Sequence, residues 1–162
     1  MANNFIKGIA SVIPQLAENT GLGQVGIITP QSVSLGPPLL VDSATYKHAV
    51  FVAPVDNCEI VEVWLSGAVS IGSGTNTLAV DNYDASANTA RNVQSAATID
   101  PDTITAKEGL KLTLSATLAS LRMDEGDVLN ATLVCGTQTT AGQGYVLTAL
   151  ILMPQPVFSI NT

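Results

Sequence analysis

Residues 111–154 read KLTLSATLASLRMDEGDVLNATLVCGTQTTAGQGYVLTALILMP, and they contain three strand patterns separated by two turns. Residues 111–115 and 127–135 alternate polar and apolar side chains, which is the period of a half-buried β-strand. Residues 145–153 are apolar at nearly every position, as in a strand that is covered on both faces. The acidic run DEGD at 124–127 predicts a tight turn between the first two patterns.

The preceding part of the chain repeats the same alternation of short strands and turns. No helical pattern there is long enough to connect parallel strands. The sequence therefore predicts an all-β fold, an antiparallel β-sandwich of jelly-roll type with about eight strands. Further strands are expected at residues 48–53, 58–68, 77–83, 93–99 and 110–115, a short piece at 118–123, and an edge strand at 157–160.

An immunoglobulin-like sandwich is the nearest competing fold, because the chain contains two cysteines and one tryptophan. The spacing does not fit, since Trp64 falls in the same predicted strand as Cys58 and far from Cys135. The two cysteines could pair across the sandwich, but small buried thiols are the commoner state, and the sequence leaves the pairing open. For Trp64 a core position is favoured over a role as an anchor for a sugar or a partner.

The first part of the chain differs from the rest. We expect residues 1–45 to form an extended N-terminal arm in which a short helix can form, and residues 46–162 to form the β-sandwich domain. Isolated extended strands at 25–28 and 39–41 are compatible with this division. A flexible leader is the alternative, but a solvated leader normally carries more charge.

Composition restricts the functions that the chain can have. It carries six basic and 13 acidic residues, for a net charge of −7, which argues against a nucleic-acid partner. Eleven of the 13 acidic residues lie between Asp56 and Asp127, so the predicted sandwich is acidic. No apolar stretch approaches the length of a membrane span, and no secretion signal is evident. Only 12% of the residues are charged, which suggests that partners cover much of the surface.

The sequence offers little for catalysis, and we expect no enzyme activity and no cofactor. His48 is the single histidine, and no serine lies on a nucleophile elbow; we interpret His48 as a strand-edge or interface residue. Glu59 and Glu62 lie three apart on a predicted strand and so point to opposite faces. The turn aspartates match no calcium loop, and no CxxC or His/Cys cluster predicts zinc.

A run over residues 49–154 resembles the small jelly-roll proteins that decorate or cement the capsids of tailed bacteriophages. The resemblance is carried by VFVAP at 50–54, by the alternating Val61, Val63 and Leu65, and by LTLS at 112–115 with EGDVL at 125–129. A glycine-containing loop and a last apolar strand that ends at Pro154 complete it.

The resemblance implies a structural virion protein that sits on the outer capsid surface and stabilises the shell by bridging capsomers. Its partners would be the major capsid protein and further copies of itself, as a homotrimer, assembled in the host cytoplasm. It implies no catalytic residues, no nucleic acid and no membrane. The alternative is a receptor- or carbohydrate-binding jelly-roll head of a phage fibre or baseplate, for which Tyr83 and Tyr145 are the candidate exposed aromatics. A secreted hydrolase or lectin fits less well, since no signal peptide or acid–base pair is found.

Two sets of residues are predicted to make the contacts. Apolar residues at helical spacing in the arm are the candidates for docking on the capsid, and apolar residues of the last strand are the candidates for the subunit interface. The first set is Phe5, Ile6, Ile9, Val12, Ile13 and Leu16, and the second is Tyr145, Leu147, Leu150 and Leu152.

Overall fold

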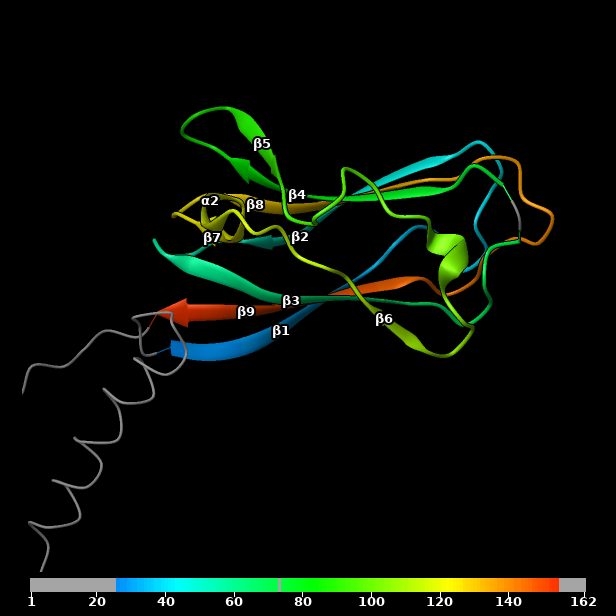
Figure 1. Ribbon diagram of the computed structural model, residues 1–162, viewed down its shortest axis with the longest axis horizontal. Helices are drawn as coiled ribbons and strands as arrows, with labels where there is room; N and C mark the ends of the chain where they lie inside the picture. The colour runs from blue at the N-terminus through cyan, green and yellow to red at the C-terminus, as the bar shows by residue number, and fades with distance from the viewer. Residues whose placement is uncertain (1–25, 73, 155–162) are drawn as a thin grey trace, which may run out of the picture.

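Two antiparallel β-sheets packed face to face make up this computed structural model, which describes residues 26–72 and 74–154 (Figure 1). One sheet has the order β1-β9-β3-β6, with the two-residue β7 also pairing with β3, and the other has the order β2-β8-β4-β5. The strands of the first sheet are β1 Gly26–Ser34, β9 Val146–Pro154, β3 Cys58–Ser66, β6 Gly109–Lys111 and β7 Arg122–Met123. Those of the second are β2 Thr45–Val52, β8 Val128–Val134, β4 Thr77–Asp84 and β5 Thr89–Asn92. Short helical turns lie at η1 Pro101–Thr103 and α2 Leu118–Leu121.

This strand order is that of a jelly roll. Along the chain, β1 and β3 alternate with β2 and β4 of the opposite sheet, and β5 continues the second sheet as a hairpin from β4. The chain returns to the first sheet at β6, and β8 and β9 then fill the middle of their sheets. Every ladder between named strands is antiparallel. The predicted antiparallel sandwich is confirmed, and the described residues contain nine strands where the sequence predicts about eight.

The core lies between the two sheets and is built by alternation along the strands. In β8, the side chains of Leu129, Ala131 and Leu133 point inward and are fully buried, while the residues between them face outward. Strand β9 supplies a matching inner row that starts at Leu147. Because the side-chain period of a strand is two, this pattern fixes which face of each strand is buried.

The predicted strand at 93–99 is wrong, because the edge of the second sheet forms earlier in the chain. Strand β5 pairs with residues 81–84 of β4, and the chain then leaves the edge. The buried Gln94 donates from Nε2 to the carbonyl oxygen of Leu78 at 3.0 Å, and Ile99 returns to form an isolated bridge with Leu78. Residues 93–99 therefore form a crossing segment in which Val93 and Gln94 are buried, residues 95–98 are exposed and no continuous ladder forms.

The predicted boundary at residue 45 does not coincide with the start of the described sandwich. Strand β1 pairs with β9 over all nine of its residues, from Gly26 opposite Pro154 to Ser34 opposite Val146. Pro30 lies within β1, which is possible because β1 is an edge strand with one side of its backbone outside the ladder. Residues 26–45 therefore belong to the sandwich, while residues 1–25 and 155–162, including the edge strand expected at 157–160, lie outside the described residues.

The inner and outer rows of β9 give a direct test of the fold. Leu147→Ala removes a side chain that is 0% exposed in the core, and we expect it to lower the free energy of unfolding by about 3 kcal/mol. Leu150→Ala, three residues further along β9 and on the outward face, should lower it by about 1 kcal/mol or less. Urea denaturation measures both. Equal losses for the two variants would contradict the assigned faces.

Candidate functional site

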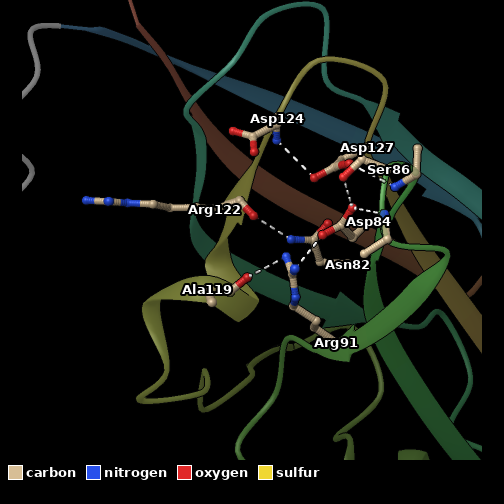
Figure 2. Close-up of polar contacts among 10 residues, drawn as sticks. Asn82, Asp84, Ser86, Arg91, Ala119, Arg122, Asp124 and Asp127 are labelled. Atoms are coloured by element: carbon tan, nitrogen blue, oxygen red, sulfur yellow. Dashed lines mark hydrogen bonds and ion pairs between the residues drawn. The ribbon is translucent and has the colours of Figure 1, made fainter.

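Polar side chains gather at the end of the sandwich where β4 enters β5, and Figure 2 shows the contacts among them. Asp84 accepts hydrogen bonds from the backbone N–H of Ala87 at 2.8 Å and from the hydroxyl of Ser86 at 2.7 Å, and it forms an ion pair with Arg91. The bond from Ala87, followed by that from Ser86 and by the Arg91 charge, lowers the pKa of Asp84 below its usual value. This carboxylate holds the β4–β5 hairpin in shape.

The same polar cluster connects that hairpin to the acidic turn and to α2. Asp127 accepts from the backbone N–H groups of Ala85 at 3.0 Å and Asp124 at 2.9 Å. Asn82 donates to the carbonyl oxygen of Arg122 at 2.6 Å. The tight turn predicted at 124–127 is confirmed: the Asp127 N–H donates to the Asp124 carbonyl, and Gly126 takes a φ of 90°.

Chemically, the cluster is suited to holding backbone segments together. Its two buried carboxylates, Asp84 and Asp127, are each occupied by N–H or O–H donors, so neither is placed to move a proton to or from a substrate. In the described part of the chain, no group of three or more His, Cys, Asp or Glu side chains is placed to hold a metal ion. The sequence does carry one signal for this hairpin: an aspartate followed two residues later by a serine, as Asp84 is by Ser86, favours a turn closed by the side chain.

His48 has a structural role. Its side chain points to the inner side of β2, and its Nε2 accepts a hydrogen bond from the backbone N–H of Gly36 at 3.0 Å. Gly36 has a φ of 85°, a conformation that favours glycine, so the bond fixes the turn that follows β1. The two cysteines are both buried and free, and burial raises the pKa of each thiol.

Trp64 lies on the outward face of β3, not in the core as the sequence favoured. Its Nε1–H donates to Glu62 at 2.8 Å, and Glu62 also forms an ion pair with Lys111. The Lys111 ammonium lies 5.7 Å from the centroid of the Trp64 ring. The hydrogen bond from Lys111, followed by that from Trp64, lowers the pKa of Glu62. A ring face occupied by a cation is a poor platform for a sugar.

The residues predicted for a subunit interface divide between the core and the surface. Tyr145 is 1% exposed and Leu147 is fully buried, so both pack within this chain and do not reach a neighbour. The Tyr145 hydroxyl accepts from the backbone N–H of Ile71 at 3.0 Å, and burial raises its pKa. Leu150 lies on the outward face of β9 opposite Pro30 of β1 and is half-buried. Leu152, opposite Ile28, is 5% exposed and is therefore buried as well. Ile28 is 52% exposed, so this face carries an apolar strip.

Other candidate features of the described chain add no reactive site. A shallow depression of about 210 Å³ is lined by mainly small and apolar residues, Ser34, Gly36, Pro37, Pro38, Gly144 and Tyr145. The six residues predicted to dock on the capsid, Phe5, Ile6, Ile9, Val12, Ile13 and Leu16, lie outside the described residues. No helix within residues 26–72 and 74–154 is long and apolar enough to cross a membrane.

Comparison with known proteins finds similarity to solved structures. No family model matches the chain, and no curated protein matches it. Among solved structures, a chain of the cyanophage Pam1 capsid asymmetric unit is similar at 19% sequence identity and a TM-score of 0.49. The similarity covers 81% of this chain and 86% of that chain.

Asp84 provides a test of the polar cluster. Its folded-state pKa is lowered, so its contribution to stability is present above the unfolded-state pKa of about 3.9 and is lost as the pH falls through the lower folded value. We expect Asp84→Asn to lower the melting temperature at pH 7 and to approach the wild type in acid. Asp124→Asn is the matched control, because the backbone and not the side chain of Asp124 binds Asp127. A difference between Asp84→Asn and wild type that stays constant down to acid pH would contradict this role.

Proposed function

We propose that this chain is a non-enzymatic structural protein of a tailed-phage virion, which binds the outer capsid surface and stabilises the shell by bridging capsomers. The observation that carries the proposal is that several polar side chains of the fold bond to its own backbone. Asp84, Asp127, His48 and Tyr145 all hold loops or turns of the sandwich in place. The jelly roll thus presents two broad sheet faces to its surroundings, and these four side chains hydrogen-bond to its own loops and turns.

The outward faces support a role in assembly. Exposed large apolar side chains include Ile28 of the first sheet and Val52 of the second, and the chain as a whole has few charges. A stable contact needs on the order of 800 Å² per partner, and each apolar Å² contributes about 25 cal/mol before the cost of association is subtracted. Much of that gain is offset by lost freedom of motion, so repetition of a weak contact over a shell would supply the avidity.

The partners in this proposal are the major capsid protein and further copies of this chain. The arm residues Phe5, Ile6, Ile9, Val12, Ile13 and Leu16 remain our candidates for docking on the shell, because they combine apolar side chains at helical spacing with little charge. Leu150 remains a candidate for contact with another subunit, since it faces outward and is only half-buried, whereas Leu152 is buried within this chain.

A receptor- or carbohydrate-binding head is the second candidate, and the aromatic side chains do not favour it. The ring of Trp64 is covered by Lys111, the hydroxyl of Tyr83 is bonded to Asn88, and Tyr145 is buried. Strong binding on a glycan array that is lost in Trp64→Ala would favour this candidate over a capsid role.

Binding to capsid shells tests the proposal. If the gene lies beside a major capsid gene, the two products can be purified and expanded shells mixed with increasing amounts of this protein. We expect saturable co-sedimentation and shells that disassemble at a higher temperature. If the protein stays in the supernatant at every concentration while the shells sediment, the capsid role is refuted.

A variant that lacks residues 1–25 tests the arm separately. It keeps all of β1, so the sandwich is preserved, and circular dichroism provides the folding control. We expect the variant to bind the shells at least about tenfold more weakly, because the apolar arm contacts are lost. Full occupancy by the truncated chain would assign the anchoring to the sandwich.

A further inference from the structure

The outward face of the sheet β2-β8-β4-β5, which we call the β8 face, is nearly free of charge. Its central strand points Asn130 and Thr132 outward, and the neighbouring positions are small, such as Ala49 on β2 and Ala79 on β4. Among the outward residues of these four strands, only Lys47 and Asp81 carry a full charge, and the two charges are opposite.

Neither of these charges has a partner within the described chain. The ion pairs found among the described residues are Arg91 with Asp84 and Lys111 with Glu62, which leaves Lys47 and Asp81 out. Asp81 is half-buried between the flanking strands, and desolvation raises its pKa. A partly desolvated carboxylate without a hydrogen-bond donor or a cation is unfavourable, so a cation supplied from outside the chain would stabilise it.

The register of the sheet places Lys47 and Asp81 symmetrically about a point on β8. Lys47 lies opposite Thr132 on one side of β8, and Asp81 lies opposite Asn130 on the other side. Residues that are directly opposite share a face, so a point on β8 between Asn130 and Thr132 is equally far from both charges. The separation is about 10 Å across the strands and about 7 Å along them. Consider a twofold axis that lies in the contact plane, passes through this point and is perpendicular to the line between the two charges. This axis places Lys47 of one copy over Asp81 of the other.

We propose that the β8 face pairs with the β8 face of a second copy about this twofold axis, so that Lys47 of each copy contacts Asp81 of the other. The dimer then contains two ion pairs, so every one of these charges is neutralised once, and the small side chains between them let the two faces approach closely. Since a twofold contact uses one surface on both copies and closes at two, it is distinct from any threefold contact through the β9 side. The inference does not depend on a capsid role.

The size of the face sets the expected strength. Strands β2 and β4 have eight residues, β8 has seven and β5 has four. Four strands side by side therefore give a face of at most about 25 by 19 Å, or about 500 Å² in projection. A standard interface uses about 800 Å² per partner, so this contact lies at the small end of the range. We therefore expect a weak dimer, with a dissociation constant in the micromolar range or above, that becomes occupied at high local concentration.

Charge exchange at the two positions tests the pairing. Sedimentation equilibrium of the full chain over a wide concentration range should fit a monomer–dimer equilibrium. Lys47→Glu and Asp81→Lys should each weaken the dimer by at least about tenfold, because each places like charges together twice. The double variant K47E/D81K should restore the wild-type dissociation constant. An equimolar mixture of the two single variants should form heterodimers, since both contacts then have opposite charges.

Two controls keep the result interpretable. Lys107→Glu and Glu108→Lys make the same charge changes in the exposed loop before β6, and they should leave the equilibrium unchanged. Thr132→Cys lies beside the proposed axis, so oxidation should link two copies through this residue, whether or not the charge variants fold. A wild-type chain that stays monomeric, or that associates equally well in all charge variants and gives no Thr132→Cys crosslink, would overturn the proposal.

Discussion

The pairing of β9 with two neighbours at once is the constraint on which the rest of the structure depends. β9 forms ladders with β1 on one side and β3 on the other, so it must be both central and nearly free of polar side chains. Its inward row, which includes Leu147 and Ile151, fills the core between the sheets. The antiparallel ladder also makes Gly26 and Pro154 neighbours, so the flanking segments of the chain start from one place.

Polar groups in this fold stabilise loops and keep the sheet faces available. The carboxylate of Asp84 and that of Asp127 bind backbone N–H groups around the β4–β5 hairpin and the acidic turn, which places rigid connections at one end of the molecule. Glu62, Trp64 and Lys111 neutralise one another on the outward face of the first sheet. What is left on the second sheet is a flat surface with one unpaired cation and one unpaired anion. Such a surface is well suited to assembly, since its charges select a register and its small side chains permit close approach.

The prediction of an interface from β9 shows how an apolar strand can mislead. The sequence correctly indicates that residues 145–153 are covered on both faces, but burial within one chain and burial between subunits give the same apolar pattern. Tyr145 and Leu147 belong to the chain's own core, Leu152 is buried as well, and only Leu150 is partly exposed. In the same way, the apolar content of residues 26–34 suggested an arm, although these residues form β1. An edge strand with a proline and several small residues has no local signal that separates it from an extended linker.

The sequence by itself determined the all-β class, the alternation that buries one side of β8, the two-faced apolar β9 and the turn at 124–127. Each of these follows from the local period of side chains or from turn chemistry, which act over a few residues. Only the tertiary structure decided that β1 pairs with β9, that Arg91 reaches Asp84, that Trp64 faces outward, and that Lys47 and Asp81 flank the same strand. These facts depend on the register between strands that are distant in the chain. Register is set by the simultaneous packing of both sheets, and no local stretch of sequence specifies it.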